Sequence, residues 1–151
     1  MIMKLKYLKN VKDPSIAKEK YKWSDQINTK LDYKKWTEFI EVNKDYYIWL
    51  EDSEKGKERL ANIDKIPENF RDGALDSLNK RQAYAEYNNK KGWYEIIINF
   101  NMEYGIVHTT FQKKITKAHL RRLLEMANHL DAYLLNSGKT VIDEEVIEEL
   151  E

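Results

Sequence analysis

The chain has 151 residues, enough for one domain with a buried core, and its apolar (42%) and aromatic (12%) shares exclude a disordered chain. Charged residues make up 34% and balance to a net charge of zero, which argues against a dedicated nucleic-acid coat protein, a class that is usually strongly basic. The absence of cysteine excludes a disulfide framework and a thiolate metal site, and it fits a reducing cytoplasm.

Neither a membrane span nor a secretion signal is visible in the sequence. No stretch approaches the roughly 20 apolar residues of a membrane helix. The N-terminus has lysines but lacks the apolar block of about 7–15 residues that a signal peptide needs. We therefore expect one cytoplasmic domain over residues 1–151, without a membrane partner.

The first 32 residues carry the weakest pattern. Met3, Leu5 and Tyr7 alternate with lysines, which is typical of a short strand. The lysine-rich stretch that follows fits helix and loop equally well. We expect residues 1–32 to form a loosely packed N-terminal arm.

Helical spacing predicts that the rest of the N-terminal half is helical. Asp32 is a candidate N-cap for a helix that runs to Asp52. Its apolar stripe comprises Trp36, Phe39, Ile40, Tyr47 and Leu50, broadened by Val42, Tyr46 and Trp49. A short helix is expected over Glu54–Asn62. Another is expected in "IPENFRDGALDSLNK", with Phe70, Ala74 or Leu75, and Leu78 facing inward.

A change of period to two predicts three consecutive strands. "QAYAEY" (Gln82–Tyr87) leads through "NNKKG", a hairpin turn, to a strand with Tyr94, Ile96, Ile98, Phe100 and Met102 on one face. "MEYG" turns the chain into "IVHTTFQKK". The segment is therefore a three-stranded antiparallel meander, with one face covered and the other solvated.

A long C-terminal helix is the expected cover. Thr116 can cap "KAHLRRLLEMANHLDAYLLN", and Gly138 is its expected stop. Its apolar arc comprises Leu120, Leu123, Leu124, Ala127, Leu130, Leu134 and Leu135. Thr140 can cap a final short acidic helix. The predicted fold class is α+β: a three-stranded antiparallel meander covered by a long C-terminal helix, with a helical N-terminal half.

The histidines form no recognisable catalytic or metal site. His119 and His129 lie ten residues apart, about 280° apart around one helix, so they cannot share a metal ion. His108 begins "HTT", half of the paired His-x-Thr signature of two-histidine phosphoesterases, and the second copy is missing. The glycines are scattered singly and cannot build a phosphate-binding loop. We expect no catalytic residue, metal or cofactor.

Asp131 falls inside the apolar arc of the predicted C-terminal helix. A buried carboxylate needs a partner because an unpaired buried charge is very costly. The favoured interpretation is a structural hydrogen bond to a tyrosine, tryptophan or arginine. A catalytic role, and a position at the helix end that touches solvent, stay open.

Acidic residues cluster in the middle of the chain and form the candidate partner-binding set. An acidic helix face is commonly just solvated, but opposed charges also speed and specify docking of a basic partner. The set comprises Glu38, Glu41, Asp45, Glu51, Asp52 and Glu54.

The layout of three segments resembles the small cytoplasmic immunity proteins of bacterial polymorphic and contact-dependent toxin systems. These segments are "YYIWLEDSEKGKERLANIDKIPENF", "GWYEIIINFNMEYGIVHTTFQKK" and "LRRLLEMANHLDAYLLNSGKTVIDEEVIEEL". The resemblance covers roughly residues 33–150. It implies a non-enzymatic protein that neutralises a cognate toxin, often a nuclease domain, by stoichiometric binding.

Two other classes stay open. One is a phage or mobile-element accessory protein, such as a host-nuclease inhibitor or a nucleic-acid adaptor. Tyr7, Tyr21 and Trp23 among the N-terminal lysines suit single-stranded nucleic acid. The other is an enzyme that uses Asp131 or His108.

Overall fold

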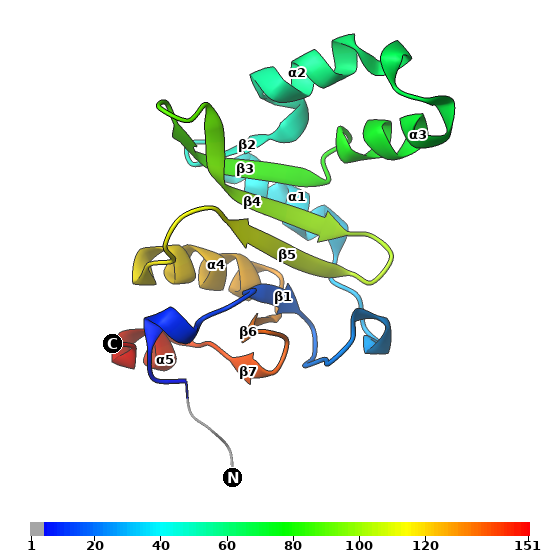
Figure 1. The fold of residues 1–151 in the computed structure, drawn as a ribbon. Helices are drawn as coiled ribbons and strands as arrows, with labels where there is room; N and C mark the ends of the chain where they lie inside the picture. Colours follow the sequence, from blue (N-terminus) through cyan, green and yellow to red (C-terminus); the bar gives the residue numbers. More distant parts are fainter. Residues whose placement is uncertain (1–4) are drawn as a thin grey trace.

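Seven strands form one antiparallel sheet in the computed structural model, which describes residues 5–151 (Figure 1). The strands are β1 (Ser15–Ala17), β2 (Tyr47–Trp49), β3 (Gln82–Asn88), β4 (Trp93–Asn101), β5 (Ile106–Phe111), β6 (Tyr133–Asn136) and β7 (Thr140–Val141). Their order in the sheet is β2-β3-β4-β5-β1-β6-β7. The α+β class is therefore confirmed, but the three predicted strands are only the middle of a wider sheet.

Five α-helices accompany the sheet within residues 5–151. They are α1 (Tyr33–Val42), α2 (Glu54–Ala61), α3 (Glu68–Ser77), α4 (Lys117–His129) and α5 (Glu144–Glu149). Figure 1 shows α2 and α3 at the end of the sheet next to β2 and β3, and α5 at the opposite end. None of these helices is both long and apolar enough to cross a bilayer.

The main core lies between one face of the sheet and helices α1, α4 and α5. Trp36 of α1 is fully buried, and its ring meets those of Trp49 and Phe100 at centre distances of 5.4 and 5.3 Å. Leu120, Leu123 and Met126 project from α4 into the same cluster. Burying each such side chain stabilises the fold by roughly 1.5–3 kcal/mol. The opposite face carries two smaller clusters, one around Leu50 and Tyr84 and one around Ile106 and Leu135.

The predicted helix from Asp32 to Asp52 is wrong in its second half. Asp32 does cap α1, accepting a hydrogen bond from the backbone N–H of Lys35. The helix ends at Val42, and the Asn43 side chain donates to the carbonyl of Phe39 at 2.7 Å. The chain then forms β2 at the edge of the sheet. An aromatic run fits helical and strand periods alike over so short a stretch, which explains the error.

The N-terminal half is also less helical than predicted. β1 lies in the sheet between β5 and β6, and all three of its residues are buried. Ile16 pairs with Val107 on one side and with Leu134 on the other. This packing is tighter than that of the loose arm expected for residues 1–32. Met3 of the predicted first strand lies outside the described residues, and residues 5–7 form no strand.

The C-terminal helix α4 is shorter than predicted. Thr116 caps it as expected, but it ends at His129. Asp131 adopts a φ of 51°, and the N–H groups of Asp131 and Ala132 donate to the carbonyls of Asn128 and Ala127. This is the Schellman arrangement, with aspartate where glycine is usual.

The last part of the chain forms a hairpin instead of extending the helix. β6 follows α4 directly and pairs with both β1 and β7. Ser137 and Gly138 both have positive φ in the turn between β6 and β7, so Gly138 is a hairpin residue and not a helix stop. Asp143, not Thr140, caps α5.

The predicted meander is present as β3, β4 and β5, with both turns in place. Ile96, Ile98 and Phe100 face the main core as expected. The alternation breaks near the first turn, where Glu86 has a φ of 56°. Glu86 turns toward the helix-covered side, while Tyr87 and Tyr94 stack together on the other side. The prediction that Tyr94 shares the face of Ile96 is therefore wrong.

Candidate functional site

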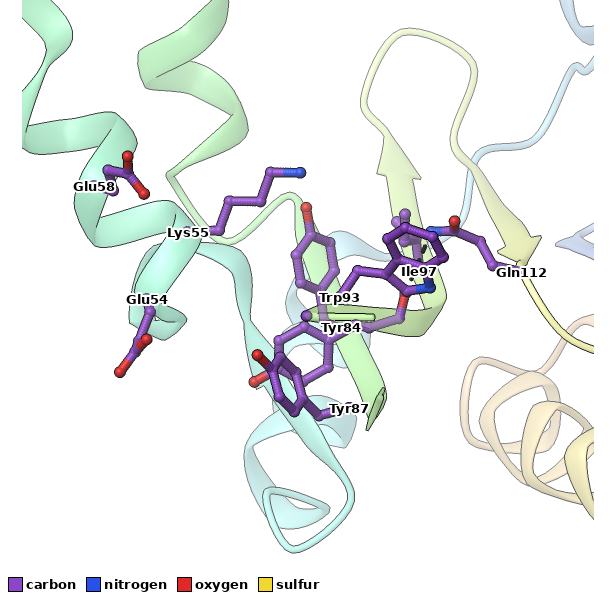
Figure 2. Close-up of a pocket in the computed structure, with 10 residues that line it drawn as sticks. Glu54, Lys55, Glu58, Tyr84, Tyr87, Trp93, Ile97 and Gln112 are labelled. Atoms are coloured by element: carbon purple, nitrogen blue, oxygen red, sulfur yellow. Dashed lines mark hydrogen bonds between the residues drawn. The ribbon is translucent and has the colours of Figure 1, made fainter. Parts of the chain in front are cut away.

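A pocket of about 660 Å³ opens on the sheet face that α1 and α4 leave uncovered (Figure 2). It lies between α2 and the hairpin of β3 and β4. Its volume falls within the range of small-ligand sites, about 300–1,000 Å³. Its lining residues are Glu54, Lys55, Glu58, Tyr84, Tyr87, Gly92, Trp93, Tyr94, Ile97 and Gln112.

The hairpin supplies an aromatic wall. Tyr84 and Ile97 face the pocket through the normal alternation of β3 and β4, and the positive φ of Glu86 adds Tyr87 and Tyr94. The Tyr94 ring lies 5.3 Å from that of Tyr84 and 4.9 Å from that of Tyr87, measured between ring centres. Tyr87 and Trp93 remain 51% and 41% exposed, so a ligand can reach both rings.

Helix α2 supplies the polar wall. Ser53 caps it by accepting the N–H of Gly56 at 3.1 Å. Gly56 sits so close to the preceding turn that an added Cβ would lie 1.7 Å from the carbonyl oxygen of Leu50. This contact holds α2 against the turn at Leu50–Asp52 that follows β2, with Glu54 and Glu58 one turn apart on the α2 side of the pocket (Figure 2).

The charges of the polar wall are not used within the molecule. Neither Glu54 nor Glu58 makes an ion pair or a side-chain hydrogen bond with residues 5–151. Lys55 extends from α2 toward Tyr84 (Figure 2). Burial raises the pKa of Tyr94, and neighbouring Tyr87 and Glu54 raise it further. The phenol therefore stays neutral at physiological pH.

The side chains of the lining are mostly aromatic, acidic and basic. The lining contains no serine, threonine, cysteine or histidine, and its hydroxyl groups are the phenols of Tyr84, Tyr87 and Tyr94. Aromatic faces attract cations and flat groups, and the carboxylates add a preference for positive charge. The Nζ atom of Lys91 lies 5.4 Å from the centre of the Trp93 ring, so a cation of the protein itself already lies next to this wall.

The predicted acidic set is dispersed over α1, the turn before β2, the turn at Leu50–Asp52 and α2. Glu41 accepts the indole N–H of Trp49 at 2.6 Å and pairs with Lys80, and this indole hydrogen bond lowers its pKa. Glu51 accepts the backbone N–H of Lys80. These two carboxylates therefore stabilise the edge around β2.

The other four residues of the predicted acidic set have different surroundings. Asp52 pairs with Lys44 at 3.4 Å. Glu38 and Asp45 are exposed and unpaired among residues 5–151, and Glu38 lies on α1, beneath the opposite face of the sheet. Of the six predicted residues, Glu54 is the one that lines the pocket.

A second polar cluster surrounds Glu86 on the helix-covered side. Its carboxylate accepts hydrogen bonds from the Tyr46 hydroxyl, from Lys113 at 2.8 Å and from His119 Nε2 at 2.8 Å. The backbone N–H of Thr116 donates to His119 Nδ1 at 3.0 Å, so both ring nitrogens are engaged. His119 has no free nitrogen for acid–base work, and the cluster holds α4 to β3.

The other singled-out residues show no catalytic partner. His108 is half-buried on β5, where burial lowers its pKa, and its side chain makes no hydrogen bond with residues 5–151. Asp131 is exposed beyond the end of α4, so the favoured interpretation of a buried carboxylate is wrong and the alternative, a position at the helix end that touches solvent, is confirmed. In the described part of the chain, no three His, Asp or Glu side chains could hold a metal ion.

Sequence reasoning missed the pocket because its walls are 26 residues or more apart in the chain, the shortest separation being that from Glu58 to Tyr84. The available signal was local: "YAEYNNKKGWY" places four aromatic residues around one hairpin turn, more than a solvated turn needs. Comparison with protein-family models, with curated proteins and with solved structures found no match.

Proposed function

We propose that this protein is a non-enzymatic binding protein whose partner is another protein, and that it neutralises a cognate toxin domain by stoichiometric binding. The observation that carries the proposal is the open pocket with an aromatic wall on β3 and β4 and two carboxylates on α2 that make no ion pair with residues 5–151. Aromatic anchors surrounded by polar groups are typical of the residues that dominate protein interfaces.

The toxin class of the partner rests on the resemblance to immunity proteins and not on the pocket. A toxin that cleaves nucleic acid commonly presents a basic surface, because that surface binds phosphates. Glu54 and Glu58 suit such a surface. The same carboxylates repel phosphates, so the pocket favours a protein partner over nucleic acid, although its rings would also stack on bases.

Two linked experiments test this function. Tagged protein is captured from lysate of its native cells in about half-molar salt, which screens weak surface contacts. Any stoichiometric partner is then expressed in a test strain, alone and together with this protein. The proposal predicts growth arrest by the partner alone and normal growth on co-expression.

A matched pair of variants separates binding from unspecific effects. Trp93→Ala should abolish the rescue of growth, whereas Trp23→Ala should leave it intact, since Trp23 is 64% exposed and does not line the pocket. A partner that does not affect growth would contradict the toxin class. Recovery of nucleic acid alone would contradict the whole proposal and favour the adaptor alternative.

A further inference from the structure

The pocket pairs an aromatic wall with carboxylates that no side chain of residues 5–151 neutralises. Tyr84, Tyr87, Trp93 and Tyr94 provide the rings, and Glu54 and Glu58 provide the charge. Guanidinium groups combine the two preferences, because they stack flat on aromatic rings and bind carboxylates through paired N–H groups. An ammonium group satisfies the charge but cannot stack in the same way.

The rest of the molecule shows this chemistry in use. Arg81 lies 4.7 Å from the centre of the Tyr33 ring, and it also pairs with Asp76 at 3.5 Å. Arg122 lies 3.7 Å from the centre of the Tyr46 ring. In the pocket, the rings and carboxylates are present and the arginine is not.

We infer that the pocket accepts an arginine side chain of the partner protein, stacked on the exposed rings of its aromatic wall and attracted by the charges of Glu54 and Glu58 on the α2 side (Figure 2). This inference rests on the proposed function and adds the chemistry of the residue that the partner inserts. Lys55 opposes it, because its ammonium group reaches into the same space (Figure 2). Removing the Lys55 charge should therefore tighten arginine binding and weaken binding of any anion.

Nuclear magnetic resonance of the full chain tests the inference. The four tryptophans give four indole N–H signals. Trp93 reports on the pocket, exposed Trp23 on unspecific surface binding, and buried Trp36 and Trp49 on the fold. The probes are N-acetyl-arginine N-methylamide, the matching citrulline derivative, which has the same shape without the charge, and oligothymidylate.

The inference predicts that the arginine probe alone shifts the Trp93 signal, with a dissociation constant in the millimolar range. Glu54→Gln with Glu58→Gln should weaken this binding by about fivefold or more, and Lys55→Met should strengthen it. Glu38→Gln is the matched control, because Glu38 is exposed, makes no ion pair within residues 5–151 and lies under the opposite face of the sheet. It should change nothing.

Three results would overturn the inference. They are an equal response to the citrulline probe, a Trp93 response to oligothymidylate that Lys55→Met weakens, and no response to any probe. Capture of the partner by the Glu54→Gln, Glu58→Gln variant distinguishes failure of the arginine inference from failure of the proposed function. If capture persists while the arginine probe fails, the arginine inference is wrong and the proposed function stands on another surface.

Discussion

Two glycines on neighbouring helices have opposite surroundings. Gly56 of α2 leaves no room for a side chain, because an added Cβ would lie 1.7 Å from the Leu50 carbonyl oxygen. Gly73 of α3 has no atom within 4 Å of the same position. One glycine is therefore required by close approach and the other is not.

Alanine substitutions at the two positions should change stability in opposite directions. Gly56→Ala forces α2 away from the turn at Leu50 and should lower the free energy of unfolding by about 1–3 kcal/mol or more. Gly73→Ala should raise it by about 0.5–1 kcal/mol, because alanine favours an exposed helix interior. Urea unfolding of both variants checks this. Equal effects would show that α2 is not held at Gly56.

Glu86 should make the free energy of unfolding depend on pH in the acidic range. Burial raises the pKa of its carboxyl, but hydrogen bonds from Lys113 and Tyr46 outweigh burial and lower the pKa to about 2, from an ordinary value of 4.5. Because the folded pKa is the lower one, the contribution of Glu86 is complete above pH 4.5 and is lost as the pH falls toward 2. Stability should therefore decline through this window.

Glu86→Gln isolates that contribution. The amide keeps a similar shape but cannot carry the charge, so its difference in unfolding free energy from the natural protein should be largest above pH 4.5 and shrink toward pH 2. Unfolding measured in urea at several pH values gives this comparison. A difference that stays constant with pH would contradict the role assigned to the Glu86 carboxylate.

At the scale of elements, β1 joins the two halves of the sheet. Ser15 and Ile16 pair with β5 on one side, and all three residues pair with β6 on the other, so the strand is central although it is short. Ile16 is fully buried in the main core. The N-terminal segment is thus part of the framework that positions the meander.

Ile16→Ala should lower the free energy of unfolding by about 2–5 kcal/mol, the usual cost of a cavity in a core. Val42→Ala is the control, because Val42 is 77% exposed at the end of α1 and should change stability by no more than about 0.5 kcal/mol. Thermal and urea unfolding measure both. Similar small effects would place β1 outside the cooperative core.

At the scale of the molecule, the sequence predicts what local chemistry decides. The hairpin turns "NNKKG" and "MEYG", and the caps Asp32 and Thr116, follow from side chains near in sequence, and all are confirmed. β1 is too short for a period to be visible. Asp131 follows α4 with a positive φ, and a glycine at this position would have predicted the end of the helix, whereas an aspartate does not.

The pocket was beyond prediction for a different reason. Its walls come from α2 and from the β3–β4 hairpin. Gly56 lets α2 pack closely on the turn at Leu50, and Glu86 has a positive φ next to Tyr87 in the hairpin. Glu54 was a candidate from its charge alone, whereas Glu58 and the four aromatic residues were not. Only the folded chain brings the two walls together.

The central claim is that a protein partner binds through this pocket, and the affinity of the captured partner for two variants tests it most directly. Calorimetry compares Tyr87→Ala, Trp93→Ala with Glu38→Gln, Asp45→Asn, whose residues are exposed and lie outside the pocket. The account predicts about a 30-fold or greater loss for the first variant, as for interface anchors, and unchanged affinity for the second. Full affinity of the pocket variant, with loss in the acidic variant, would contradict it and return the interface to the acidic residues of the middle segment.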